Sequence, residues 1–358
     1  MTRNNARTLA TVGAAIAVTV AGSVAADAQE RVRWKMQSAF GSQLPHLGTA
    51  GVRFTENMER VSDGTFRVEF YEPGALVPAL ECFDAGSRGS VESCWTTPGY
   101  HTGKIPALAF FTAVPFGPQY GEFFAWKKFG GGDDLKNEIY AEHNMYSLDC
   151  YAIGPETSGW FREPVESLES LRGLKMRFFG LGAQVMQKLG VSTQLLAGAD
   201  IYPALERGVI DATEFSMPAM DIDLGFYQVA KNNYFPGWHQ QVSVNELLMH
   251  KPAWEALSDQ HQAMVELACG ENIHFNYAET EANNPIAMNK MVEENGVQIR
   301  RWTDEELAAF EKAWREVLDE QSAADPTFKK VADSYRAFRE VYKTWGEAQF
   351  LRSTYQTE

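Results

Sequence analysis

The sequence has few of the groups on which metal-thiolate, redox or nucleophilic chemistry depends. Its 358 residues include four cysteines but no CxxC pair, and no histidine lies at ligand spacing from a cysteine. Zinc sites and thioredoxin-type chemistry are therefore unsupported. The sequence also lacks an HExxH motif and a Gly-x-Ser-x-Gly elbow. Catalytic machinery is not visible, and we do not expect an enzyme.

The four cysteines, Cys82, Cys94, Cys150 and Cys269, leave two interpretations open. A disulfide between Cys82 and Cys94 could form if a helix with the first packs beside a strand with the second. Buried, unpaired thiols are the alternative that we favour.

Basic side chains are in the minority. The chain has 32 Lys and Arg against 47 Asp and Glu, which gives a net charge of −15. Such a surface repels nucleic acid and offers no basic patch to phospholipids. A site for an organic anion must therefore depend on local positive charge.

Long hydrophobic runs are scarce. An Ala/Val-rich run over residues 9–26 follows Arg3 and Arg7, and small residues precede Gln29. This pattern predicts a signal peptide over residues 1–28. No later segment is long, apolar and free of proline or charge, so we expect a soluble, periplasmic protein.

Strands alternate with helices along the rest of the chain, which predicts an α/β fold with mostly parallel sheets. The first series has strands over 32–38, 66–71 and 91–95, and the strand over 32–38 is expected at an edge. The second series has strands near 146–153, 174–178, 193–195 and 212–215. Two series in about 330 mature residues predict two lobes, with a ligand cleft between them.

We expect lobe 1 over 29–150 with a return segment near 236–275, and lobe 2 over 151–235 with a return segment near 276–325. A helix over 259–296 is long enough to bridge the lobes, and Pro285 should kink or interrupt it. A capping box at Thr303–Glu306 opens another helix. The apolar stripe of the last helix, within 326–358, fits packing on its own lobe or on a second subunit equally well.

Arg177 ends a predicted strand and is followed by two glycines, Gly180 and Gly182, at the start of a helix. Open α/β sheets bind ligands at the carboxyl ends of strands, and a helix start with exposed N–H groups favours an anion. The alternative is a surface arginine in a weak ion pair. The third glycine of a dinucleotide fingerprint is missing, so a nicotinamide site is poorly supported.

Glu214 ends another strand, 37 residues after Arg177, in an apolar neighbourhood. A carboxylate there must be paired, metal-bound or protonated. Glu156 lies on the turn after the strand that joins the lobes. Either glutamate alone is most often solvated.

From Trp34 to Phe350 the chain resembles the extracytoplasmic solute-binding proteins of tripartite ATP-independent periplasmic (TRAP) transporters. It is most similar to the branch that binds 2-oxo acids together with a metal ion. The resemblance rests on seven segments that occur in the same order, at residues 77–85, 103–107, 112–117, 159–162, 175–177, 210–214 and 236–239.

The resemblance implies that Arg177 pairs with the substrate carboxylate, and that Tyr100, Thr97, Phe179 and Phe215 surround the ligand. It implies that the metal is held by Glu214, the backbone carbonyl of Phe215, Gln240 and Glu156, which also faces the substrate. It further implies delivery to TRAP membrane subunits and a homodimer formed through the C-terminal helix.

The chain departs from the branch at two positions, with Phe215 where tryptophan is usual and Glu156 where glutamine is usual. Together with Arg177, Glu214 and a monocarboxylate, Glu156 gives a site charge of −2. Calcium would neutralise that charge and sodium would not, so we favour calcium.

Two other functions fit the same residues. One is a secreted enzyme that uses the metal as a Lewis acid on an organic acid, and it needs a general base that is not evident. The other is a ligand-sensing partner of a membrane receptor. The side chain of the 2-oxo or 2-hydroxy acid stays open at this point.

Overall fold

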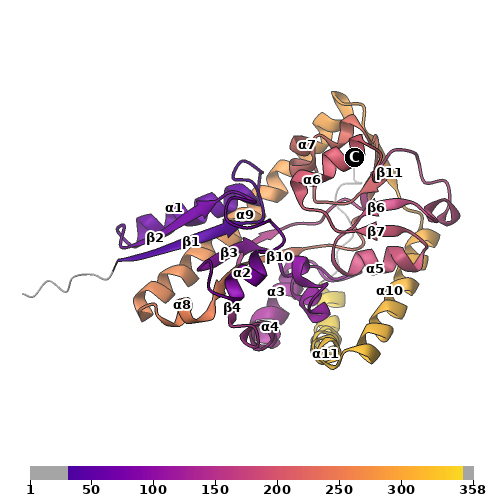
Figure 1. Cartoon of the computed structure of the whole chain (residues 1–358). Helices are drawn as coiled ribbons and strands as arrows, with labels where there is room; N and C mark the ends of the chain where they lie inside the picture. The colour runs from indigo at the N-terminus through magenta and orange to yellow at the C-terminus, as the bar shows by residue number, and fades with distance from the viewer. Residues whose placement is uncertain (1–30, 350–358) are drawn as a thin grey trace, which may run out of the picture.

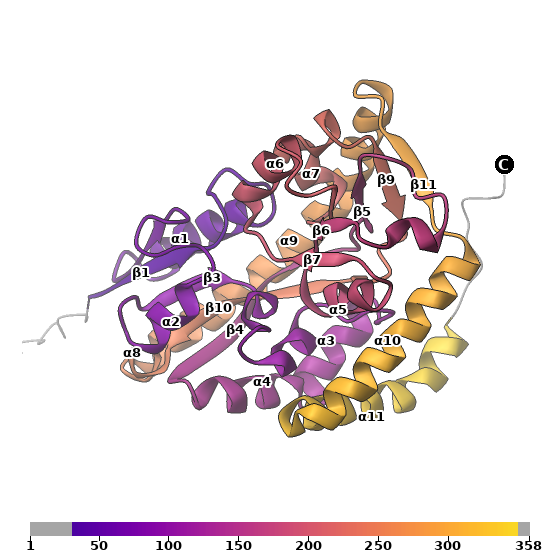
Figure 2. The ribbon, with the colours of Figure 1, turned by 45° about the vertical axis from the view of Figure 1, so that its right-hand side comes forward.

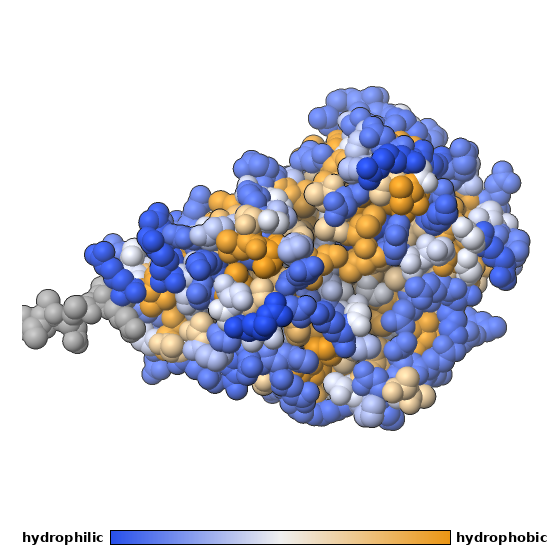
Figure 3. Space-filling model, in the orientation of Figure 1, coloured by the Kyte–Doolittle hydropathy of each residue, from blue (hydrophilic) through white to orange (hydrophobic). Residues whose placement is uncertain are grey.

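The computed structural model describes residues 31–349. The expected signal peptide over 1–28 and the tail over 350–358 lie outside this range. Within it, no helix combines the length and the apolar character that crossing a membrane requires. The face shown in Figure 3 is mainly hydrophilic, with apolar residues exposed in small groups.

The first lobe is built on a five-stranded sheet. The strand order is β2-β1-β3-β10-β4, and the strands are β1 (Val32–Ser38), β2 (Phe66–Tyr71), β3 (Ser93–Thr96), β4 (Met145–Ile153) and β10 (Ser243–His250). β1 is parallel to β2 and β3, whereas β10 is antiparallel to β3 and β4. The expectation that 32–38 forms an edge strand is wrong, because β1 lies between β2 and β3. Alternating apolar and polar residues indicate that one face of a strand is covered, and they do not indicate how many strands lie beside it.

Helices and 3-10 turns surround this sheet. They are α1 (Gly48–Val61), α2 (Cys82–Ser87), η1 (Pro98–His101), η2 (Pro106–Phe111), α3 (Tyr120–Phe129), α4 (Gly132–Ala141) and α8 (Lys251–Glu255). Trp95 and Tyr151 stack in the core with ring centroids 4.3 Å apart, and both are fully buried.

The second lobe is built on a six-stranded sheet of order β11-β9-β5-β8-β6-β7. Its strands are β5 (Gly159–Phe161), β6 (Lys175–Arg177), β7 (Ser192–Gln194), β8 (Ala212–Thr213), β9 (Asn232–Phe235) and β11 (Gln298–Arg301). Its helices are η3 (Leu168–Leu171), α5 (Gly180–Lys188), α6 (Gly198–Glu206), α7 (Pro218–Leu224) and η4 (Phe226–Gln228). The two lobes with a long helix confirm the predicted fold class.

The long helix α9 (Asp259–Glu293) runs from the first lobe to the second, packing on β4 and α1 and then on α7 (Figures 1 and 2). The helix continues through Pro285, so the expected interruption does not occur. Glu281, four residues before Pro285, is exposed. Water can therefore satisfy the backbone carbonyl of Glu281, which Pro285 leaves without a partner in the helix.

All four cysteines are paired, and the expectation of unpaired thiols is wrong. Cys82 of α2 bonds Cys94 of β3, and Cys150 of β4 bonds Cys269 of α9. The second pair joins residues 119 positions apart. Only the packing of α9 on β4 brings them together, which no local pattern indicates.

Helices α10 (Asp304–Ala324) and α11 (Pro326–Ala348) form a hairpin that touches both lobes (Figure 2). The predicted capping box between Thr303 and Glu306 is confirmed at the start of α10. α10 packs on α5 of the second lobe, while α11 packs on η2 and α3 of the first. The apolar side of α11 is buried at its start and exposed near its end. Phe328 is buried in the first lobe, whereas Val341 and Trp345 are 80% and 59% exposed.

Candidate functional site

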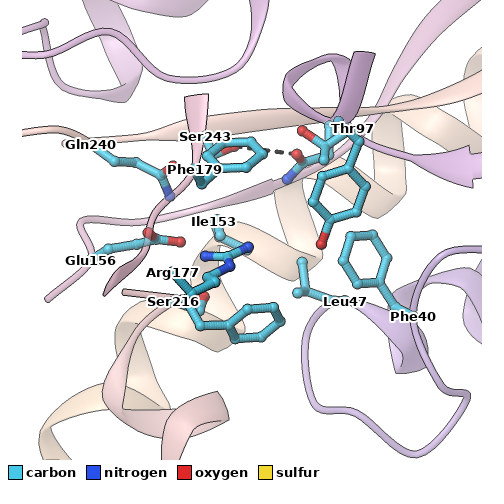
Figure 4. A pocket seen from close by; sticks show the side chains of 13 residues that line it. Phe40, Leu47, Thr97, Ile153, Glu156, Arg177, Phe179, Ser216, Gln240 and Ser243 are labelled. Atoms are coloured by element: carbon cyan, nitrogen blue, oxygen red, sulfur yellow. Dashed lines mark hydrogen bonds between the residues drawn. The ribbon is translucent and has the colours of Figure 1, made fainter. Parts of the chain in front are cut away.

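A pocket between the two lobes spans about 320 Å³, part of which is open to solvent (Figure 4). Residues of both lobes line it: Phe40, Leu47, Thr97, Tyr100, Ile153, Glu156, Arg177, Phe179, Phe215, Ser216, Gln240, Ser243 and Asn245. The structure thus brings all the predicted site residues to this pocket except Glu214, which lies directly behind Arg177. Six lining residues were not predicted, because none of them is ionisable and such side chains are common throughout the chain: Phe40, Leu47, Ile153, Ser216, Ser243 and Asn245.

Strand pairing explains how Arg177 and Glu214 meet. β6 and β8 are parallel neighbours, and Arg177 at the end of β6 lies beside Thr213 at the end of β8. Glu214 follows at the same edge of the sheet, and its backbone N–H donates to the carbonyl of Arg177 at 3.0 Å. This edge is where open α/β sheets bind ligands.

Arg177 is 1% exposed, so the interpretation as a surface arginine is wrong. Its Nη1 donates to the Glu214 Oε2 at 2.9 Å and to the Glu214 carbonyl at 2.6 Å, and its Nε donates to the Leu196 carbonyl at 3.3 Å. The rings of Phe215 and Phe179 lie 5.2 and 6.0 Å from the guanidinium carbon. The planar cation is held rigidly, with Nη2 outside these hydrogen bonds.

Glu214 is fully buried. Its Oε2 also accepts from the backbone N–H of Phe179 at 3.0 Å, while its Oε1 has no hydrogen-bond partner among the described residues. Burial is the largest influence and opposes ionisation, but the Arg177 guanidinium together with the neighbouring His239 and Glu156 outweighs it and lowers the pKa of Glu214. The site therefore contains a carboxylate with one oxygen available to a ligand or cation.

Glu156 reaches the pocket from the segment that follows β4. Its backbone N–H donates to the Gln240 carbonyl at 3.2 Å. The two segments cross so closely at Gly237 that an added Cβ would lie 2.1 Å from the Glu156 carbonyl oxygen. Burial raises the pKa of Glu156 to about 7, and the nearby Glu214 adds to this rise while His239 opposes it.

His239 completes a cluster with the two glutamates, and it was not among the predicted site residues. Its Nε2 lies 3.4 Å from the Glu156 Oε2 and 3.7 Å from the Glu214 Oε1. Burial alone would lower its pKa, but the hydrogen bond to Glu156 and the nearby carboxylate of Glu214 raise it to about 9. The signal that could have indicated it is its place directly before Gln240, a predicted oxygen ligand.

The donor set fits a hard cation. Glu156, Glu214 and His239 each offer a ligand atom, and these atoms lie within 4.8 Å of one another. The Gln240 side chain is buried with an unpartnered amide nitrogen, and rotation of that amide presents its oxygen instead. Carboxylate and amide oxygens are the ligands that calcium and sodium prefer.

The wall opposite these groups comes from the first lobe. The Tyr100 ring meets the Phe179 ring edge-on with centroids 5.7 Å apart. Gly99 lies under the same ring, where an added Cβ would be 2.0 Å from the Phe179 Cζ. Thr97 Oγ1 is hydrogen-bonded to Thr112 Oγ1 at 3.0 Å, and this contact holds the Thr97 hydroxyl in the pocket wall. The two lobes therefore touch around the pocket, as in a closed form.

The chain is similar to transport proteins of bacteria. A model of the family "Bacterial extracellular solute-binding protein, family 7" matches residues 38–325. A monocarboxylate 2-oxoacid-binding periplasmic protein of Nostoc sp. (strain PCC 7120) is 34% identical over 321 residues, which cover 89% of this chain and 87% of the relative.

Two solved structures extend this similarity. A TRAP transporter solute-binding protein from Bordetella bronchiseptica, a dimer with calcium and picolinate, has a TM-score of 0.87 and 33% identity, covering 89% of this chain and 95% of its own. A TRAP periplasmic solute-binding protein from Pseudoalteromonas atlantica, with sodium and pyruvate, has a TM-score of 0.86 and 28% identity, covering 89% and 97%.

Proposed function

The chain belongs to family 7 of the bacterial extracellular solute-binding proteins, and we propose that it captures a small 2-oxo or 2-hydroxy monocarboxylate together with a metal ion in the periplasm. The bound acid would then be delivered to the membrane subunits of a TRAP transporter. The observation that carries this proposal is the buried Arg177 beside a cluster of oxygen donors between two lobes. The 2-oxo acid named for the Nostoc relative and the pyruvate and picolinate in the solved structures support the same ligand class.

We propose that Arg177 holds the acid group, because its other hydrogen bonds fix the guanidinium without using Nη2. Tyr100, Thr97, Phe179 and Phe215 would enclose the rest of the ligand. Glu156, Glu214, Gln240 and the Phe215 carbonyl would hold the metal. When bound, the metal supplies positive charge that binds the carboxylate and the adjacent oxygen of the acid.

His239 changes the charge balance on which the choice of metal rests. With neutral His239, the two glutamates, Arg177 and a monocarboxylate sum to −2, which calcium neutralises. With protonated His239 the sum is −1, which sodium neutralises. We propose calcium, because a bound divalent cation repels a proton on an imidazole so close to it.

We propose that the ligand shifts the lobes towards the closed form, since groups of both lobes contact it only when they meet. The closed form would be the one that docks with the membrane subunits. The bound acid would leave the protein chemically unchanged.

The exposed Val341 and Trp345 on α11 support the further proposal of a homodimer through this helix. We further propose that lobe 1 comprises residues 29–150 with a return segment near 236–275, and lobe 2 residues 151–235 with a return segment near 276–325.

A melting assay tests the function. Purified protein freed of metal by a chelator is heated with 2-oxo acids, with and without calcium or sodium. We expect 2-oxo acids to raise Tm, calcium to increase the rise more than sodium, and the recovered acid to be chemically unchanged. Failure of calcium to stabilise the stripped protein would contradict the choice of metal, and a converted acid would indicate an enzyme.

Arg177→Ala tests the central contact. We expect this variant to bind pyruvate more weakly by about 2–5 kcal/mol in titration calorimetry, because the substrate carboxylate and Glu214 both lose their cation. Arg172→Ala is the matched control: Arg172 lies in the same lobe but is exposed, and within residues 31–349 its one ion pair is with Glu169. Equal affinities for the two variants would end the assignment of Arg177.

A further inference from the structure

A second cavity adjoins the proposed ligand site and extends it away from the charged groups. It spans about 850 Å³ between the lobes, part of which is open to solvent. Its lining comes from the loops after β1 and β2 and from the helices α6 and α7: Ala39, Phe40, Gly41, Leu44, Pro73, Gly74, Ala79, Ala197, Gly198, Ala199, Asp200 and Leu224.

The wall between the two cavities is thin. Phe40 lines both of them. Phe215 lines the first, and Gly198 lines the second directly behind it, where an added Cβ would lie 2.8 Å from the Phe215 Cζ. The side chains of Phe40 and Phe215 therefore lie where the ligand site meets the larger space.

The first cavity changes from polar to apolar in the direction of the second. In Figure 4, Glu156 and Gln240 lie on one side of Arg177, and Phe40 and Leu47 lie on the other. A ligand whose acid group is held at Arg177 and the oxygen donors therefore directs its other end towards Phe40.

The charges of the second cavity also select its occupant. Asp200 is the one ionisable residue among those that line it in the described part of the chain. A second carboxylate would be repelled there and would find no basic partner, whereas an aliphatic chain loses contact with water at little cost.

We propose that the ligand is a 2-oxo monocarboxylate with an extended aliphatic chain, which passes between Phe40 and Phe215 into the second cavity. This inference rests on the proposed function and specifies its substrate. Pyruvate fills the polar end alone, and each added methylene buries further apolar surface against Phe40, Leu44 and Ala199.

Titration calorimetry with straight-chain 2-oxo acids, from pyruvate to 2-oxooctanoate in calcium buffer, tests the inference. We expect Kd to fall by about fourfold for each methylene that enters the second cavity. 2-Oxoglutarate should bind more weakly than 2-oxovalerate, which has the same number of carbons and one carboxylate. A Kd that rises steadily from pyruvate, or tighter binding of 2-oxoglutarate, would overturn the proposal.

Ala199→Phe tests the location of the chain. Ala199 is exposed in the first turn of α6, so a phenyl ring there fills the second cavity without disturbing the core. We expect unchanged affinity for pyruvate and loss of the gain with chain length. Ala308→Phe, at an exposed alanine of α10 that lines neither cavity, should behave as wild type.

The outcomes separate this inference from the proposed function. If pyruvate binds but chain length gives no gain, or Ala199→Phe weakens pyruvate and 2-oxooctanoate equally, the extended ligand is refuted and the function stands. If no 2-oxo acid binds to the wild-type protein under any metal condition, the proposed function itself is refuted.

Discussion

Replacement of Gly99 by alanine should prevent the lobes from closing fully. Gly99 lies in η1 of the first lobe, and an added Cβ would be 2.0 and 2.5 Å from the Cζ and Cε2 atoms of Phe179 in the second lobe. Ordinary carbon contacts are about 3.5–4.0 Å, so the ring and the methyl group cannot both keep their places. Phe179 is buried, with the Tyr100 ring packed against it at 5.7 Å between centroids, which leaves the Phe179 ring little room to withdraw.

The cost follows from overpacking, which destabilises a packed contact by about 1–3 kcal/mol. Because the clash exists only in the closed form, apparent ligand affinity should fall by about five- to 150-fold. The Tm of the ligand-free protein should stay near that of wild type, since opening of the lobes relieves the clash. Gly99 does not have a positive φ, so alanine brings no backbone strain of its own.

Titration calorimetry with pyruvate and calcium measures the affinity, and small-angle X-ray scattering measures closure as a decrease in radius of gyration. Gly103→Ala is the matched control, because an added Cβ there meets nothing within 4 Å. The double variant Gly99→Ala/Phe179→Leu should recover part of the lost affinity. Wild-type affinity and full closure in Gly99→Ala would refute the view that this structure is the closed, ligand-binding form.

Three further predictions concern stability and are measured by urea unfolding. Replacing both Cys150 and Cys269 by alanine should lower the free energy of unfolding by about 4–5 kcal/mol on the chain-entropy model. Removal of the Cys82–Cys94 disulfide should cost less, because it closes a much shorter loop, and equal costs would contradict this reasoning. Asp149→Asn should lower the free energy of unfolding by about 3–5 kcal/mol, because the ammonium of buried Lys136, 2.5 Å from the Asp149 carboxylate, loses its partner. A loss below about 1 kcal/mol would show that neighbouring acidic side chains take the place of Asp149. Burial lowers the pKa of His101 from 6.5 to about 3, so His101 stabilises the fold above pH 6.5, and this contribution declines as the pH falls towards 3 by about 1.4 kcal/mol per unit. His101→Phe should remove that slope between pH 6.5 and 5, and an unchanged slope would assign it to other groups.

Local pattern identified the parts of the site that lie at the ends of strands. Arg177 and Glu214 each follow a short β-type segment, and parallel strands present their carboxyl ends at one edge. Glycines after Arg177 indicated the start of α5, and the capping box at Thr303 indicated the start of α10. These features depend on interactions between residues a few positions apart, which a sequence displays directly.

Other features depend on distances across the fold. The burial of Arg177 decides between a weak surface ion pair and a fixed cation, and burial is a property of packing. His239 joins Glu156 because the segment after β9 crosses the segment after β4 at Gly237. The sequence of neither segment contains a pattern that predicts contact with the other.

The sequence by itself determined the class of the fold, the approximate order of its strands and helices, and the charged residues that a small organic anion would need. Periodicity, glycine placement and charge carry that information, since each acts over one turn of helix or one strand. Tertiary structure alone decided the pairing of all four cysteines, the place of β1 inside its sheet and the second cavity behind Phe40 and Phe215. Each of these requires segments far apart in the chain to meet, and the free energy that brings them together comes from burial of a core shared by the whole lobe.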